Sequence, residues 1–154
     1  MAALMPANRL ACRVALATGL HISDVLSLRT SQLGARMTVR ESKTGKRRRV
    51  SLPDDLLAAL RAQAGPLWVF SGARDPAKHR TRQAVWYDVR RAARAFRLRQ
   101  HVSPHSLRKV YAVRLLRRSG GRLERVQNAF RHSDASVTMI YAMADELYRR
   151  KYGD

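Results

Sequence analysis

Positive charge limits what this chain can fold into more than any other feature of its sequence. The 154 residues include 31 Lys and Arg against 11 Asp and Glu, which gives a formal net charge of +20. Such an excess repels itself in a compact fold, and a polyanion bound to the surface relieves the repulsion. The charge therefore indicates nucleic acid as the partner, with an anionic membrane surface as the alternative.

The apolar residues indicate a folded domain and give no support to a membrane partner. They make up 45% of the chain, which is typical of a globular protein and not of a disordered basic tail. Membrane binding would require a long apolar run or a basic amphipathic helix, and the sequence has neither. The only cysteine, Cys12, excludes an internal disulfide and fits a reducing compartment. We expect a cytoplasmic protein with no membrane partner.

The spacing of the apolar residues predicts one domain, residues 1–154, that is mainly α-helical with a small antiparallel β-sheet. Alternation over residues 37–41, a turn at residues 44–45 and a returning strand over residues 47–52 predict a hairpin. The apolar run at residues 67–70 is predicted to add a third strand. Helices are predicted to begin near residues 8, 53, 81, 105, 123 and 135, and Ser23 is predicted to cap a further short one.

A histidine and an arginine three residues apart are the first candidate site. His105 and Arg108 follow Pro104 at the predicted start of a helix, so their side chains point to one side. An imidazole and a guanidinium in that arrangement can hold a phosphate, and the amino end of the helix favours the negative charge. Alone, the pair is a weak signal, and in an arginine-rich chain a surface arginine beside an incidental histidine is the favoured interpretation.

A second candidate lies near the end of the chain, in the run FRHSDASVTMIYA. Its histidine, His132, precedes Tyr141 by nine residues. This run resembles the end of the catalytic domain of the tyrosine recombinases (the phage integrase family), in which a glycine–histidine pair precedes the nucleophilic tyrosine by the same spacing. The family has a glycine where this chain has Arg131, and we expect the larger side chain to crowd the approach of the backbone to a phosphate.

Three runs upstream resemble further parts of the same family. PHSLRKVYAVRLL resembles its HxLR box, TGLHISDVLSLR its first box, and ESKTGKRRRVSLP the hairpin that carries its catalytic lysine. With the terminal run they form four boxes in the family's order, from about Ala11 to Ala142. The resemblance therefore implies the tyrosine-recombinase catalytic fold, and site-specific DNA recombination through a 3′-phosphotyrosyl intermediate.

The resemblance also implies a role for each residue of the site. Tyr141 attacks the phosphorus, His105 accepts the tyrosine proton, and Arg108 neutralises the non-bridging oxygens. His132 donates a hydrogen bond to the phosphate, and Lys43 protonates the leaving 5′ oxygen. A contact to the DNA backbone is an equal alternative for Lys43. This chemistry uses no metal and no other cofactor.

One position departs from the family in a way that bears on activity. His21 stands where the family has its first catalytic arginine, although the surrounding frame is kept at Thr18, Gly19, Leu20, Asp24 and Leu28. An imidazole is mostly neutral at pH 7 and lacks the fork that grips two oxygens. We expect His21 to stand beside the phosphate as a weaker substitute. The expected outcome is reduced activity or, alternatively, a catalytically decayed integrase-like protein that only binds DNA.

Other residues are assigned to DNA contacts or to the core. Of the three consecutive arginines at residues 47–49, two are predicted to face solvent or phosphate and one to face away. Trp68 and Trp86 are predicted to lie in the core. The residues predicted to contact the DNA backbone are Lys46, Arg47, Arg48, Arg80 and Arg82.

The expected partner is double-stranded DNA carrying an attachment-type site, with self-association of the protein on that DNA. Such a protein is expected to be nucleoid-associated in a prokaryotic or phage context. Leu147, Tyr148 and Tyr152 have helical spacing in the tail, which the resemblance implies docks on a neighbouring copy. The chain has no room for the family's N-terminal core-binding domain, so we expect a fragment or a truncated gene product. A type IB topoisomerase and a generic RNA-binding protein are the more distant alternatives.

Overall fold

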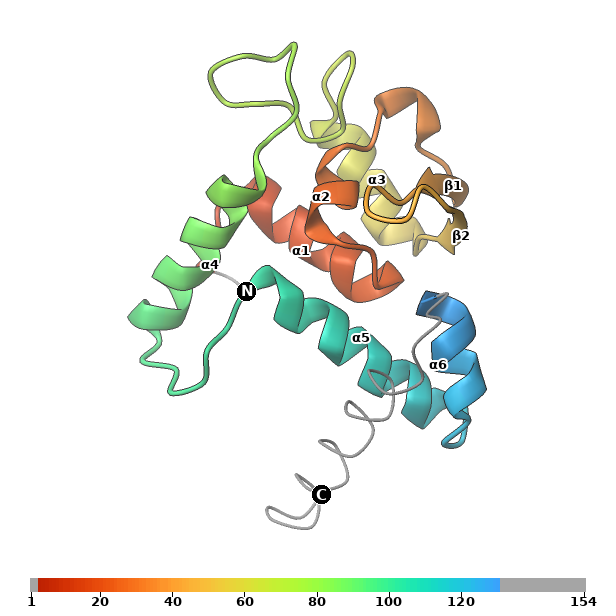
Figure 1. Cartoon of the computed structure of the whole chain (residues 1–154). Helices are drawn as coiled ribbons and strands as arrows, with labels where there is room; N and C mark the ends of the chain where they lie inside the picture. The colour runs from red at the N-terminus through yellow and green to blue at the C-terminus, as the bar shows by residue number, and fades with distance from the viewer. Residues whose placement is uncertain (1–2, 131–154) are drawn as a thin grey trace. The chain divides into compact units, whose positions relative to one another are not determined.

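A computed structural model describes residues 3–130 of the chain (Figure 1). The chain divides into two compact units, Met1–Arg108 and Lys109–Asp154. Helix α5 (Pro104–Arg118) begins in the first unit and continues into the second. The predicted helix near residues 135–141 and the tail after it lie outside the described residues.

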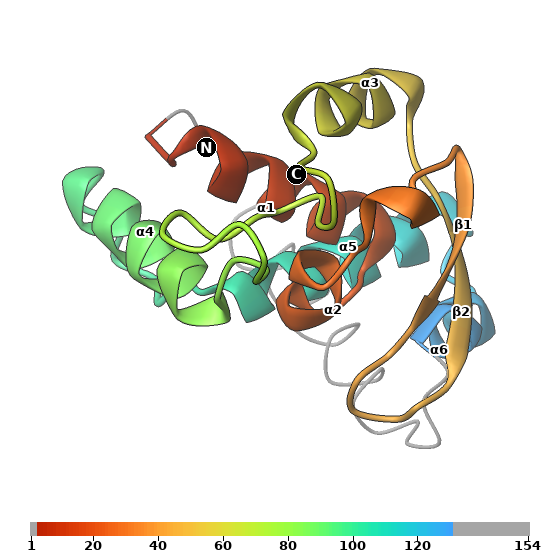
Figure 2. The same cartoon turned by 90° about the horizontal axis from the view of Figure 1, so that it is seen from above.

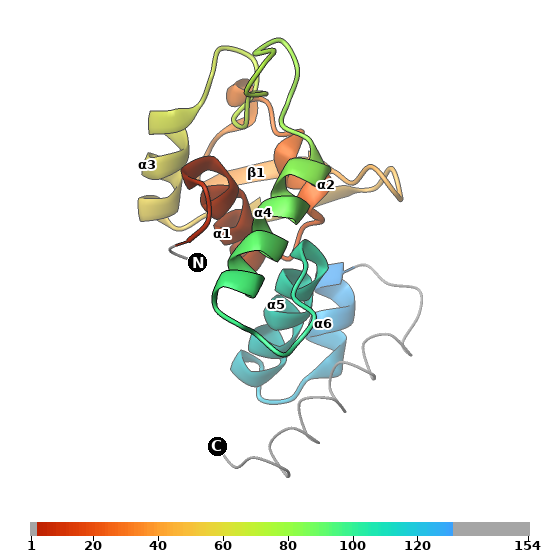
Figure 3. The same ribbon diagram turned by 90° about the vertical axis from the view of Figure 1, so that its left-hand side faces the viewer.

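The first unit is built around helix α1 (Pro6–Thr18), which contacts three other helices. A proline in its first turn suits the start of a helix, because the missing N–H has no partner there. The helix ends at Gly19, whose φ of 68° is left-handed and whose N–H donates to the Ala15 carbonyl. Figures 2 and 3 both show α1 between α3 and α4. The predicted helix and its end at Gly19 are confirmed.

Helix α2 (Ile22–Leu26) follows after three residues and starts earlier than predicted. His21 is the residue that precedes its first turn, with an extended backbone at φ −65° and ψ 146°, and its carbonyl accepts the N–H of Val25 at 3.0 Å. Ser23 lies inside the helix, so the prediction that it caps the helix was wrong. The start at His21 places that side chain at the junction between α1 and α2.

The predicted hairpin is confirmed as strands β1 (Arg36–Arg40) and β2 (Arg47–Ser51), which pair antiparallel with Arg36 opposite Ser51. Buried and exposed residues alternate along both strands, so one face of the hairpin lies against the core. The buried positions are Met37, Val39, Arg48 and Val50.

The third strand predicted at residues 67–70 does not join this sheet, which has two strands within the described residues. That run pairs instead with the segment after α2. The Thr30 N–H donates to the Leu67 carbonyl at 3.1 Å, and the Val69 N–H donates to the Leu28 carbonyl at 3.0 Å. The prediction was wrong because an apolar run shows burial without showing which backbone will satisfy its hydrogen bonds.

Helices α3 (Asp54–Gln63) and α4 (Arg82–Ala95) complete the first unit. The Thr81 hydroxyl caps α4 by accepting the Ala84 N–H at 3.2 Å. Trp86 on α4 is 40% exposed, so its predicted core position was wrong; Trp68 is half-buried, with the Arg29 guanidinium 4.6 Å from the centre of its ring. Within residues 3–130, no helix is long and apolar enough to cross a bilayer.

The described part of the second unit contains the rest of α5 and helix α6 (Leu123–Phe130). The turn between them uses Gly120 and Gly121, both with positive φ. A small cluster of Ala112, Val126 and Phe130 is buried there. The mainly helical fold with a small antiparallel sheet is thus the one that the sequence predicts.

The amino end of α1 is capped by a carboxylate from α4. Asp88 Oδ2 accepts the Met5 N–H and the Asn8 side-chain amide, both at 2.8 Å, and Oδ1 accepts from Arg91 at 2.6 Å. A negative charge at this end also suits the helix dipole. Burial raises the pKa of Asp88, but the hydrogen bonds from Asn8, Arg91 and Met5 outweigh it, and the net pKa is lowered.

Replacing Asp88 should therefore destabilise the protein in a pH-dependent way. We expect Asp88→Asn to lower the free energy of unfolding by about 1–3 kcal/mol at pH 7, because its partners lose a charged acceptor. The lowered pKa means that the ionised carboxylate stabilises the fold fully above its unfolded-state pKa of about 4, and that this contribution is lost progressively as the pH falls from there through the lowered pKa of the folded state. Urea unfolding at pH 7 and pH 3 measures both effects.

Asp55→Asn is the matched control for that experiment. Asp55 pairs with Arg13 at 2.6 Å, but its side chain is exposed. An exposed pair contributes about 0–1 kcal/mol. If Asp88→Asn costs no more than Asp55→Asn, the capping role of Asp88 is contradicted.

Candidate active site

Two arginine side chains converge on the carbonyl end of α1. Arg108 from α5 donates from Nη1 to the Gly19 carbonyl, and Arg48 from β2 donates to the same oxygen at 3.4 Å and to the Thr18 carbonyl at 2.5 Å. Arg48 is 5% exposed and Arg108 is 6% exposed. The last carbonyls of a helix lack partners within it and carry partial negative charge, so they can hold cations. The end of α1 therefore fixes both guanidinium groups.

Two buried carboxylates balance this positive charge. Glu41 Oε1 lies 3.7 Å from Arg48 Nη1. Asp24 Oδ1 accepts both the N–H of Ser42 at 2.9 Å and its hydroxyl at 2.6 Å. The second interaction ties the β1–β2 loop to α2, and Lys43 is exposed on that loop next to the tethered serine.

His21 lies at this charged junction and not in the apolar core. Its side chain is half-buried. Burial lowers its pKa, the positive charge of Arg108 lowers it further, and Asp24 and Glu41 partly oppose the shift; His105 adds a smaller lowering. The imidazole is therefore predominantly neutral at pH 7, and a bound anion would make its protonation easier.

The first turn of α5 orients His105 and Arg108. The Ser103 N–H donates to the Ser106 hydroxyl at 3.2 Å, and the Ser106 N–H donates to the Ser103 carbonyl at 2.9 Å, which closes the start of the helix. His105 is exposed at this start, and Arg108 lies buried one turn later. The chain thus brings three predicted site residues close to one another.

The other predicted site residues lie elsewhere on the molecule. Of the consecutive arginines, Arg47 and Arg49 are exposed and Arg48 is buried, as the two-to-one division predicts. Arg48 donates to the Thr18 and Gly19 carbonyls and lies 3.7 Å from Glu41, so its partners give it a structural role. Lys46 and Arg82 are exposed, whereas Arg80 is half-buried.

The remainder of the predicted site cannot be placed. Arg131, His132 and Tyr141 lie outside the described residues. Among residues 3–130, no three His, Cys, Asp or Glu side chains form a group that could hold a metal ion. Within the described residues the candidate site contains an exposed imidazole, His105, and a buried guanidinium, Arg108, three residues apart, and groups of this kind can hold an anion.

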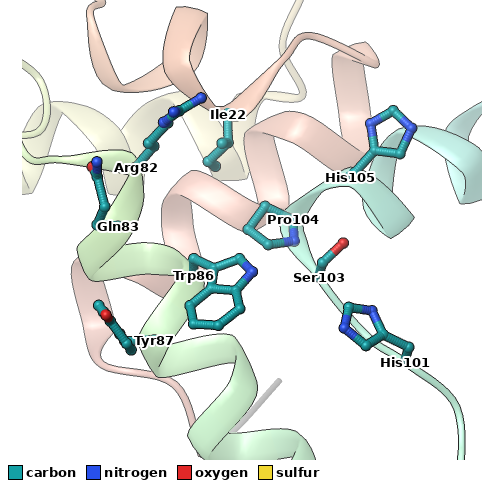
Figure 4. Close-up of a pocket in the computed structure, with 9 residues that line it drawn as sticks. All are labelled: Ile22, Arg82, Gln83, Trp86, Tyr87, His101, Ser103, Pro104 and His105. Atoms are coloured by element: carbon teal, nitrogen blue, oxygen red, sulfur yellow. The ribbon is translucent and has the colours of Figure 1, made fainter.

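A pocket of about 480 Å³ adjoins His105 and is not among the features predicted from the sequence. It lies between α4 and the segment that leads into α5, with Ile22 between them (Figure 4). An aromatic pair at residues 86–87 next to an arginine was the available signal. Trp86, the tryptophan of that pair, is predicted to lie in the core and instead lines this pocket.

Comparison of sequences identifies relatives of this chain. The sequence model of the Phage integrase family matches residues 2–147. "Tyrosine recombinase XerD" of Rhizobium meliloti (strain 1021) is 35% identical over 136 residues, which cover 81% of this chain and 43% of that protein. An "Integrase/recombinase" of Escherichia coli is 30% identical and covers 87% of this chain and 53% of that protein. The chain spans about half the length of these relatives.

Comparison of structures gives the same fold. The XerH site-specific recombinase bound to difH substrate has a TM-score of 0.73 at 20% identity, over 89% of this chain and 42% of that one. The catalytic domain of bacteriophage HP1 integrase has a TM-score of 0.63 at 23% identity, over 93% of this chain and 80% of that one. A lambda integrase dimer bound to a COC' core site has a TM-score of 0.70 at 22% identity, over 88% of this chain and 51% of that one.

Removing one partner of the buried pair of Glu41 and Arg48 should destabilise the protein strongly. We expect Arg48→Met to lower the free energy of unfolding by about 3–5 kcal/mol, because it leaves the Glu41 carboxylate buried without its cation. The double substitution Arg48→Met with Glu41→Gln should recover a substantial part of that loss. Urea unfolding of the two single variants and the double variant gives the coupling energy.

Arg49→Met is the control, since Arg49 neighbours Arg48 on β2 but is exposed. A surface substitution of this kind usually changes stability by less than about 0.5 kcal/mol. Equal losses in Arg48→Met and Arg49→Met would contradict the structural role of Arg48.

Proposed function

The chain belongs to the phage integrase family, and from this we propose that it is the catalytic part of a tyrosine recombinase. Its proposed reaction is the cleavage and rejoining of duplex DNA at an attachment-type site, through a 3′-phosphotyrosyl link to Tyr141. The observation that carries the proposal is the meeting of His21, His105 and Arg108 at the end of α1. Two of the structural neighbours were solved with DNA, difH and the COC' core site, which supports the same class of substrate.

The main difficulty of the reaction is that the negative charge of the phosphodiester repels a nucleophile, and the proposed site residues would reduce this repulsion. Arg108 would neutralise the non-bridging oxygens and stabilise the added charge of the transition state. Its hydrogen bond to the Gly19 carbonyl holds the guanidinium in place before DNA arrives. His105, one turn earlier and exposed, is available to the phosphate and to the attacking hydroxyl.

The covalent step conserves the number of phosphoester bonds. The Tyr141 oxygen bonds to phosphorus and gives its proton to His105, while the bond from phosphorus to the 5′ oxygen breaks. The leaving oxygen takes a proton from Lys43 or, if Lys43 only contacts the DNA backbone, from water. Attack by a 5′ hydroxyl reverses the step, so neither ATP nor another cofactor is consumed.

Because His21 replaces the first of the family's two arginines, we expect the protein to cleave DNA more slowly than an enzyme with both arginines. A neutral imidazole donates at most one hydrogen bond and adds no charge. The second candidate function, a decayed integrase-like protein that binds DNA without cleaving it, is favoured by the same observation. The two candidates share the DNA-binding surface, which we assign to the exposed residues Lys46, Arg47 and Arg82.

Self-association on the DNA, through the tail beyond Tyr141, belongs to the same proposal. The expected localisation follows from it, since a protein that acts on chromosomal or phage DNA would be found with the nucleoid. Both depend on the DNA-binding function, and neither is needed for the chemistry at the phosphate.

The nucleophile can be tested with a nicked suicide duplex, which traps the covalent complex by releasing a short strand. The probe is DNA from the attachment site flanking the gene. We expect wild-type protein to form a covalent complex that Tyr141→Phe abolishes, while duplex affinity stays nearly unchanged because only one hydroxyl is lost. Tyr148→Phe is the control and should retain the complex. Covalent capture that survives Tyr141→Phe would contradict the assignment.

The loss of cleavage rate that His21 causes can be measured by replacing it with the arginine that the family has at this position. Loss of one well-placed donor to a transition-state oxyanion typically costs a factor of roughly 10²–10³ in rate. His21→Arg should therefore raise the rate of covalent-complex formation by a comparable factor on the same suicide duplex. A less stable His21→Arg protein with no gain in rate would contradict a phosphate-facing role for His21.

The pH dependence provides a second readout for the same pair of proteins. Because the pKa of His21 is lowered from 6.5, the neutral form predominates at pH 7 and the imidazole gains charge only as the pH falls below about 6.5. The wild-type rate should then rise relative to that of His21→Arg as the pH falls. A lowered pKa also means that the fold is more stable with His21 neutral, and this part of the stability is lost as the pH falls through the lowered pKa. Both rates are therefore measured only at pH values where circular dichroism shows folded protein.

A further inference from the structure

The pocket beside His105 has two walls of different character. One wall is the first two turns of α4, with Arg82, Gln83, Trp86 and Tyr87; the other is the segment with His101, Ser103, Pro104 and His105 (Figure 4). All of these residues belong to the first unit. A volume of about 480 Å³ lies within the range of sites that hold small organic ligands, about 300–1,000 Å³.

Two exposed aromatic rings distinguish this pocket from an ordinary surface hollow. Trp86 is 40% exposed and Tyr87 is 68% exposed, and their rings meet edge to face with centres 5.1 Å apart. The Arg90 guanidinium lies 5.7 Å from the centre of the Trp86 ring. Side chains of this size usually gain stability by burial, so their exposure in a pocket indicates a partner with a flat apolar face.

The edge of the pocket carries donors that suit an anion next to that face. Arg82 is exposed at the start of α4, and His101 and His105 are exposed on the opposite wall. An apolar floor edged by an arginine and two imidazoles matches a nucleotide, whose base is flat and whose phosphate is negative and accepts hydrogen bonds. An apolar peptide side chain would use the rings but not the basic edge.

We propose that this pocket binds a single nucleobase, unstacked from the duplex, next to the phosphate held at His105. The inference rests on the proposed function, because DNA must reach His105 for the base to reach Trp86. Stacking on the aromatic pair offsets the stacking that the base loses in the duplex, and it does so for any base because every base has a π face. The pocket would thereby hold the strand in register at the cleavage position.

The test uses two bulged duplexes of equal charge. Each has about 15 base pairs and one unpaired nucleotide, which is a 2-aminopurine in one duplex and an abasic residue in the other. We expect wild-type protein to bind the 2-aminopurine duplex roughly ten-fold more tightly than the abasic one, and to quench the 2-aminopurine fluorescence by stacking. Trp86→Ala and Tyr87→Ala should each remove most of this preference and leave affinity for the abasic duplex unchanged.

Trp68→Phe is the matched control, since Trp68 is a tryptophan of the same unit outside the pocket. It should keep both the preference and the quenching. Tyr87→Ala guards against misfolding, because a residue that is 68% exposed contributes little to stability. Equal affinity of wild-type protein for the two duplexes, or a preference that survives both pocket variants, would overturn the base-binding role.

The same titrations separate this proposal from the function on which it rests. If both duplexes bind equally and affinity falls steeply with salt, the protein binds DNA phosphates and the pocket does not bind bases. If neither duplex binds at low salt, DNA binding itself fails and the pocket proposal fails with it. Displacement of the 2-aminopurine by an apolar peptide, without loss of duplex binding, would assign the pocket to a protein partner instead.

Discussion

The carbonyl oxygen of Gly19 accepts hydrogen bonds from two buried arginines, and the rest of the candidate site depends on that arrangement. The left-handed turn at Gly19 ends α1 and points its last carbonyls at Arg48 and Arg108. Two cations this close would repel one another without the partial negative charge of the helix end and the nearby carboxylate of Glu41. The turn at Gly19 thus ends the central helix of the first unit and also holds the guanidinium of Arg108, which would meet a phosphate.

His21 leaves this site with less positive charge than an arginine at the same position would give it. The carboxylates of Asp24 and Glu41 would favour a protonated imidazole, but burial and the charge of Arg108 outweigh them. Arg48 does not compensate, because its guanidinium is held by the Thr18 and Gly19 carbonyls and its charge is balanced by Glu41. A phosphate would therefore meet one fixed cation and two imidazoles, an arrangement that holds an anion but stabilises the transition state incompletely.

Much of this arrangement could be predicted from sequence, for identifiable reasons. The spacing of His105 and Arg108 after a proline requires a helix start, and alternation with a glycine turn requires a hairpin. The inward direction of Arg48 follows from alternation, because Arg48 shares a face with Val50 whereas Arg47 and Arg49 lie on the other face. The carbonyls at the end of α1 that Arg48 meets could not be predicted, since they are distant in sequence. Trp86 was assigned to the core because helical spacing marks an apolar face, but the segment before α5 leaves that part of α4 open. The pairing of residues 67–70 with the segment after α2 could not be predicted either, because the two segments are distant in sequence.

The central claim is that uncompensated phosphate charge limits this site, and one measurement tests it directly. Cleavage rates would be compared on two suicide duplexes that differ only at the cleavage position, one with the natural phosphodiester and one with an uncharged methylphosphonate. We expect wild-type protein to cleave the methylphosphonate duplex faster than the natural one, and the ratio of the two rates to be smaller in His21→Arg. A wild-type rate that is equal on both duplexes, or slower on the methylphosphonate, would contradict the claim.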